Sequence, residues 1–111
     1  MARVNDSIGR CYFNIDGDRI NDNIGRWCYR VDGDRVYDSI GRPRYRIDRD
    51  TIYDDIGRPR LRFDGRTVYD SIGRPVYRVD GSRIYDNIGR PQFTIDGYVS
   101  NRMLMAIIAV L

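Results

Sequence analysis

Apolar and polar residues alternate along most of the chain, in short runs separated by turns rich in Asp and Gly. Alternation with a period of two is typical of β-strands that bury one face. Around Gly33-Asp34, for example, apolar residues flank a two-residue turn with glycine first, which favours a type II′ hairpin. The cross-strand pairs predicted for this hairpin are Val31 with Val36, Asp32 with Arg35, and Arg30 with Tyr37.

The same hairpin recurs at a fixed spacing along the chain. Its apolar pair reappears as Ile15 with Ile20, Ile47 with Ile52, Phe63 with Val68, and Val79 with Ile84. The sixth copy fails at Ile95, whose counterpart is Ser100. We therefore expect the hairpin in five copies, and a change of structure after the sixth repeat.

An Ile-Gly-Arg triplet marks the repeat. It begins at residues 8, 24, 40, 56, 72 and 88, so the period is 16 residues. Six copies occupy residues 1–97, and the tail 98–111 belongs to none of them. A constant period of this kind indicates a repeat architecture. At 111 residues, the chain is predicted to form one domain.

A second turn, residues 38–42, joins successive hairpins. Its Asp is suited to bind nearby backbone amides, its Gly to a left-handed backbone, and the following Pro43 to the start of a strand. Isoleucine is unusual in such a turn. Because an isoleucine occupies this position in all six copies, we interpret the six as a layer that closes this end of the structure over the core.

Twelve strands follow from this pattern, and the short turns make neighbours in sequence antiparallel neighbours in space. The strands are predicted at residues 2–6, 11–16, 19–22, 27–32, 35–38, 43–48, 51–54, 59–64, 67–70, 75–80, 83–86 and 91–96. One face of these strands is apolar, and the other carries mainly Arg and Tyr.

A sheet with one apolar face is predicted to close into an up-and-down barrel, since closure removes its exposed edges. Twelve strands leave a hollow. Residues 102–111 contain no Gly or Pro, and are expected to fill it as an apolar helix with Ser100 or Asn101 as its N-cap. The predicted fold is an all-β, twelve-stranded antiparallel barrel of six hairpin repeats around a short C-terminal helix. A β-solenoid or an open stack of hairpins is the alternative.

Composition supports strands and offers little for catalysis. All 19 basic residues are Arg and all 16 acidic residues are Asp, and the chain has no Lys, Glu or His. Identical Asp positions in identical repeats provide equivalent environments, whereas acid–base catalysis needs different ones. We therefore expect no enzyme activity, no catalytic residue and no cofactor. Asp16-Gly17-Asp18 resembles part of a calcium loop, but turn capping explains it better, so no metal site is expected.

Cys11 and Cys28 lie 17 residues apart against a period of 16, so they are expected to project to opposite faces. Such a pair is poorly placed for a disulfide, and free thiols favour a reducing, cytoplasmic location. The first residues already belong to a repeat, so no secretory signal is expected. The apolar tail is too short to span a bilayer, although contact with a membrane surface stays open.

Two columns of residues are predicted to share the outer face. Arg30, Arg46, Arg62 and Arg78 stand opposite Tyr37, Tyr53, Tyr69 and Tyr85. Arginines beside aromatic rings can bind nucleic acids. The interspersed aspartates repel a phosphate backbone, however, so we favour cation–π pairs that stabilise the sheet. The repeat is broken at five positions, Tyr12, Trp27, Cys28, Val76 and Gln92. We interpret them either as contacts for a protein partner, with Trp27 and Tyr12 as its anchor, or as an effect of the barrel seam.

The repeat unit resembles known proteins. Arg-Ile-Tyr-Asp-Ser-Ile-Gly-Arg-Pro-x-Tyr-Arg-Ile-Asp-Gly is similar to the IYDxxGRxxxRIDG units of a family of short bacterial repeat proteins, over residues 3–97, and the tail 98–111 resembles their apolar ending. The Tyr-Asp-x-x-Gly-Arg core is also similar to the YD repeats of large bacterial toxin shells. Twelve strands around a helix resemble the tubby-like and scramblase-like barrels in plan. The repeat family implies no established activity.

The function predicted from the sequence is a non-enzymatic structural or interaction module whose partner is another protein or a second copy of the chain. A tubby-like barrel that binds lipid, with an interior that accepts an acyl chain, is the first alternative. An oligonucleotide binder that uses the Arg and Tyr columns is the second. A self-assembling fibre subunit is the third.

Overall fold

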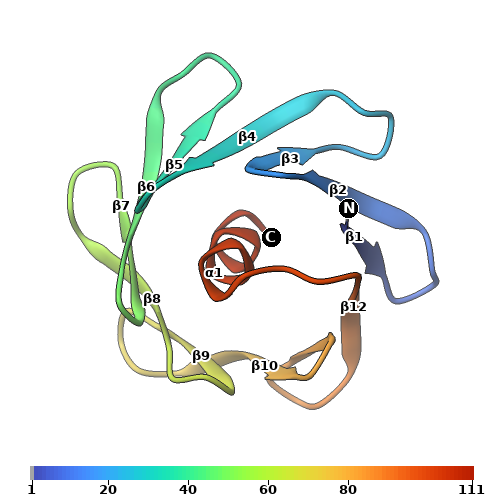
Figure 1. Ribbon diagram of the computed structural model, residues 1–111. Coiled ribbons are helices and arrows are strands. Elements are labelled where there is room, and N and C mark those ends of the chain that lie inside the picture. Colours follow the sequence, from blue (N-terminus) through green and yellow to red (C-terminus); the bar gives the residue numbers. More distant parts are fainter. Residues whose placement is uncertain (1) are drawn as a thin grey trace.

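Each strand pairs with the strand before it and the strand after it, and all pairs are antiparallel (Figure 1). The computed structural model describes residues 2–111; Met1, which the repeat period includes, lies outside the described residues. The strands are β1 (Ala2–Asp6), β2 (Cys11–Asp16), β3 (Arg19–Asn21), β4 (Trp27–Asp32), β5 (Arg35–Asp38), β6 (Pro43–Asp48), β7 (Thr51–Asp54), β8 (Pro59–Phe63), β9 (Thr67–Asp70), β10 (Pro75–Asp80), β11 (Arg83–Asp86) and β12 (Pro91–Asp96).

The first and last strands close the ring. β1 pairs with β12, and Val4 stands opposite Ile95, the residue whose hairpin partner is missing in the sixth repeat. The predicted twelve-stranded barrel is therefore confirmed, and the solenoid and the open stack are wrong. Antiparallel pairing within every hairpin excludes parallel coils, and the β1–β12 pair leaves no open edge.

The predicted hairpin register is confirmed. Val31 pairs with Val36, Asp32 with Arg35 and Arg30 with Tyr37, and the other four hairpins follow the same register. β3 and β8 each end one residue earlier than predicted. In β8 the cause is Asp64, whose carboxylate accepts hydrogen bonds from the amides of Arg66 and Thr67 and so belongs to the turn.

The interior is filled by α1 (Asn101–Val110), which Figure 1 shows nearly end-on at the centre of the ring. Ser100 is the N-cap, and its hydroxyl accepts a hydrogen bond from the Met103 amide at 3.1 Å. Four consecutive residues of the helix, 105–108, are at most 1% exposed. A ten-residue helix is about 15 Å long, and the shortest dimension of the molecule is 18 Å, so the helix matches the height of the wall.

The two sets of turns lie at opposite ends of the barrel, because alternate turns of an up-and-down barrel share an end. One end carries the turns with Ile8, Ile24, Ile40, Ile56, Ile72 and Ile88, and we call it the isoleucine end. The other carries the turns at residues 17–18, 33–34, 49–50, 65–66 and 81–82, and we call it the glycine end. Grooves place Ser100 and Arg102 beside Gly17 and Arg49, but Val110 beside Arg26 and Trp27. The helix therefore ends at the isoleucine end.

The interpretation of the six isoleucines as a core layer is wrong. They are 68–71% exposed. Each turn is a three-residue loop in which Ile40, for example, precedes the left-handed Gly41, whose φ is 87°. This loop directs the isoleucine side chain away from the barrel, and the partly buried Val110 and Leu111 of the tail cover the core at this end instead.

Candidate binding surface

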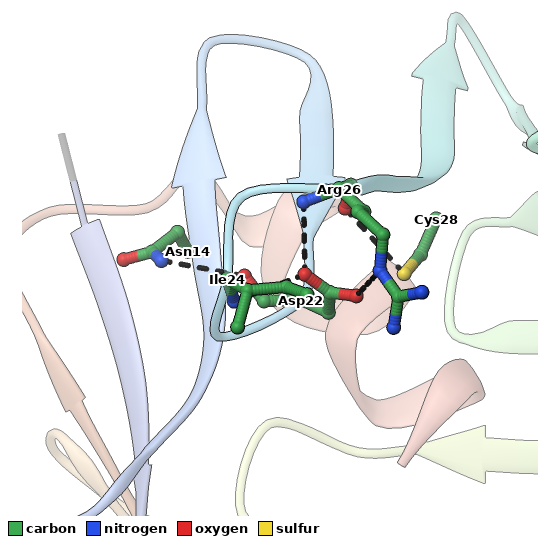
Figure 2. A network of polar contacts seen from close by, with 5 residues as sticks. All are labelled: Asn14, Asp22, Ile24, Arg26 and Cys28. Carbon is green, nitrogen blue, oxygen red and sulfur yellow. Dashed lines mark hydrogen bonds and ion pairs between the residues drawn. The ribbon is translucent and has the colours of Figure 1, made fainter.

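The isoleucine turns are built around one aspartate each, as Figure 2 shows for the second copy. One carboxylate oxygen of Asp22 accepts hydrogen bonds from the backbone amides of Ile24 (3.1 Å) and Arg26 (2.8 Å). The other oxygen accepts the Nε–H of Arg26 at 2.8 Å. Asn14 donates to the carbonyl of Asp22 at 3.4 Å, and the Cys28 thiol donates to the carbonyl of Arg26 at 3.7 Å.

The other five copies repeat this geometry, with Arg Nε to Asp Oδ2 distances between 2.9 and 3.2 Å. The arginine side chains of these six pairs are 66–77% exposed, whereas the aspartates are only 12–25% exposed. Each turn therefore directs its carboxylate inward, towards its own backbone, and shows solvent an isoleucine and a guanidinium group.

The aspartates of these turns are held in the charged form. The hydrogen bond from the Arg42 amide, assisted by the Ile40 amide and the Arg42 side chain, lowers the pKa of Asp38 below its ordinary value. The same causes lower the pKa of Asp6, Asp54 and Asp70. For Asp22 and Asp86 desolvation is the largest single effect and raises the pKa, but the hydrogen bonds from Arg26 and Arg90 outweigh it.

A bulge follows each isoleucine turn, which sequence reasoning missed. In the β5–β6 pair, Val36 stands opposite Tyr45 and Tyr37 opposite Pro43, so Arg44 is the extra residue. The extra residues of the six bulges are Tyr12, Cys28, Arg44, Arg60, Val76 and Gln92. These six residues occupy the same position of the repeat, and that position has no consensus residue in an otherwise regular repeat. This variability is the only sign of the bulge in the sequence.

Tyr12 and Trp27, the two predicted anchor residues for a partner, both lie at the isoleucine end. Tyr12, Trp27 and Cys28 line a groove together with Arg44 and Val110, the last residue of α1. Tyr12 is 44% exposed and Trp27 is 39% exposed. The ring of Tyr12 contacts those of Phe13 and Phe93, with centroids 4.7 and 5.3 Å apart.

The thiol in this groove is not activated. Desolvation, followed by the negative charge of Asp22, raises the pKa of Cys28 above its ordinary value. A raised pKa keeps the thiol protonated at neutral pH, and the thiolate is the nucleophile in cysteine chemistry. Cys11 is likewise free, in agreement with the prediction that the two cysteines form no disulfide.

The predicted columns on the outer wall pair as cation–π contacts. The guanidinium carbons of Arg30, Arg46, Arg62 and Arg78 lie 5.1, 4.3, 4.6 and 4.7 Å from the ring centroids of Tyr37, Tyr53, Tyr69 and Tyr85. Arg30 and Arg46 also form ion pairs with Asp32 and Asp48. A fifth pair, Arg19 over Trp27 at 5.3 Å, was not predicted, because the repeat's Tyr position is Asn21 in that hairpin.

Comparison with protein-family models, with curated proteins and with solved structures found no match. Within residues 2–111, no three His, Cys, Asp or Glu side chains gather in a group that could hold a metal ion. The described part of the chain also contains no helix with the length and apolar character needed to cross a membrane.

Proposed function

We propose that the protein is a non-enzymatic binding module that attaches to a partner surface through its isoleucine end. The observation that carries this proposal is the repeated exposure of isoleucine at a turn tip, 68–71% in six copies. The third position of such a turn favours small polar residues. The isoleucine side chain is not needed to form the turn and does not pack in the core. Contact with a partner explains why isoleucine occupies this position in all six copies.

The scaffold suits a module of this kind. The wall is closed, the interior is filled by α1, and both support the six turns in fixed positions. Contacts that are individually weak become strong when a rigid body makes several at once. Among residues 2–111, no polar or charged residue is buried. This surface distribution of ionisable groups supports binding over acid–base catalysis, which needs carboxylates in contrasting environments.

Site-specific photo-crosslinking in the cells that produce the protein tests the proposal without assuming the class of partner. A photoreactive side chain replaces Ile40 in one variant and Tyr98 in the matched control. Tyr98 is more exposed than any isoleucine, at 89%, and it adjoins the glycine end. We expect adducts at position 40 and few at position 98, detected as mass-shifted protein. Equal yields at the two positions contradict the proposal.

A further inference from the structure

We propose that the partner surface is an anionic lipid bilayer, which the barrel contacts end-on with its six isoleucine turns. This inference rests on the proposed function and names the partner. Three features of the isoleucine end support it: the separation of the apolar side chains, the direction of the charges and the position of the amphipathic aromatic residues.

The six isoleucines are dispersed rather than clustered. Each stands on its own turn, one 16-residue repeat from the next, around a molecule 34 by 33 Å across. In Figure 1 the turns between β3 and β4, β5 and β6, and β7 and β8 extend outward from the wall. A protein partner needs a matching apolar pocket for every turn. A fluid bilayer needs none, because lipids rearrange around each inserted side chain.

The charges of this end complement an anionic surface. The six turn arginines are exposed and their aspartates are turned inward. Arg44 and Arg60, at the bulges, add two more exposed cations there, and Asp55 adds one exposed carboxylate. At the glycine end the five hairpin turns and their flanking residues carry eight aspartates and only five arginines, all of them exposed. A negative membrane surface therefore attracts the isoleucine end more strongly than the glycine end.

Amphipathic aromatic side chains complete the surface. Trp27 and Tyr12 are partly exposed beside the turns, and Trp and Tyr are the residues enriched at membrane–water interfaces. Membrane contact of this kind requires no lipid inside the barrel. The interior is occupied by α1, which disfavours a barrel that accepts an acyl chain.

Partitioning onto vesicles tests the inference, with Trp27 as the reporter because it is the only tryptophan in the chain. The probes are unilamellar vesicles of phosphatidylcholine alone and of phosphatidylcholine mixed with phosphatidylserine. We expect co-sedimentation with the mixed vesicles, weakened by salt. We also expect a blue shift of Trp27 emission on binding, and its quenching by lipids with brominated chains.

Variants of the turn isoleucines distinguish insertion of these side chains into the bilayer from attraction by the arginines alone, because they leave all charges in place. Replacing Ile40, Ile56 and Ile72 with Asn, which the turn tolerates, is expected to weaken partitioning by at least about tenfold. The matched control Tyr98→Asn is expected to leave it unchanged. Far-ultraviolet circular dichroism and thermal melting verify the fold, and the single variant Ile40→Asn replaces the triple variant if that one unfolds.

The inference is overturned if the wild-type protein fails to bind the mixed vesicles, or if the isoleucine variants bind as well as the wild type. It is also overturned if Trp27 emission does not shift on binding. Adducts between position 40 and a protein, together with absent vesicle binding, overturn the bilayer as partner and leave the proposed function standing. Equal crosslinking at positions 40 and 98 removes the proposed function itself.

Discussion

At the residue scale, Arg49 is the one non-glycine residue among the described residues with a positive φ, at 59°. It occupies the first position of a turn where Gly17, Gly33 and Gly81 have φ of 61–62°. A left-handed backbone brings Cβ close to the carbonyl oxygen, and this strain costs about 1–2 kcal/mol in a residue with a side chain. The third glycine-end turn, residues 49–50, therefore adopts a backbone conformation that its first residue disfavours.

Replacing Arg49 with Gly is therefore expected to stabilise the protein. Relief of strain outweighs the greater flexibility of glycine in the unfolded chain, and we expect a net gain of about 0.5–1 kcal/mol. The free energy of unfolding in urea measures it. Arg66→Gly is the control, because Arg66 lies in the next glycine-end turn but its own φ is not positive; there the positive φ belongs to Gly65. A gain of the same size in both variants argues against strain at residue 49.

A second residue-scale contrast separates buried from exposed isoleucine. Ile107 is fully buried in α1, whereas Ile72 is 70% exposed on its turn. We expect Ile107→Ala to cost about 2–5 kcal/mol, since it removes apolar contacts and leaves a cavity. Ile72→Ala is expected to change stability by about 0.5 kcal/mol or less. Chemical denaturation measures the free energy of unfolding of both variants. If the two lose similar amounts, the turn isoleucines do pack against the rest of the protein.

At the element scale, α1 is the part of the fold on which the wall depends. Residues 103 and 105–108 are buried against the strands, so their removal exposes the apolar interior of the barrel. Deleting residues 101–111 is expected to cause aggregation or collapse of the remaining repeats. Size-exclusion chromatography and circular dichroism follow the outcome. A truncated chain that stays monomeric with unchanged strand content shows that the wall is stable without the helix.

Most of these elements could be predicted from the sequence because each depends on local chemistry. Gly33 before Asp34 determines one hairpin register, and the spacing of Val31 and Val36 determines which face is buried. The sequence predicts Ser100 or Asn101 as the N-cap of α1, and in the structure the Ser100 hydroxyl accepts the capping hydrogen bond. These features need only neighbours in sequence.

The candidate surface was predicted less well, since it depends on geometry that no single repeat reveals. Tyr12 and Trp27 stood out as departures from the repeat, but nothing in the sequence placed them beside Val110. The sequence predicts that Ile40 and its equivalents form a core layer because isoleucine recurs in all six copies, but recurrence does not show in which direction a side chain points. Its exposure follows from the three-residue loop and the bulge at Arg44, which redirect the strand ends outward.

At the scale of the whole molecule, acid is expected to unfold the protein through many equivalent groups at once. Seven aspartates have a pKa below the ordinary value of 3.8: the six of the isoleucine turns and Asp64, whose pKa is lowered first by its hydrogen bond from the Thr67 amide. A lowered folded-state pKa stabilises the fold above the unfolded pKa, and this stabilisation is lost as pH falls through the folded value.

We therefore expect the melting temperature to be nearly constant between about pH 5 and 8, where the chain has no histidine to titrate, and to fall steeply below about pH 4. Thermal melts across this range measure it. Asn retains an oxygen that accepts the backbone amide hydrogen bonds but has no charge. In the double variant Asp38→Asn, Asp54→Asn we therefore expect the melting temperature to fall less steeply below about pH 4. If the melting temperature of the variant falls as steeply as that of the wild type, other carboxylates cause the acid sensitivity.

The seam between β1 and β12 links the length of the chain to the width of the barrel. Because Val4 must reach Ile95, each 16-residue unit contributes two strands to the circumference. Adding or removing one repeat would give a ring of fourteen or ten strands. A shorter ring has no room for the same tail, and a longer one leaves a gap around it. The fixed size of the ten-residue helix therefore disfavours barrels with more or fewer than six repeats.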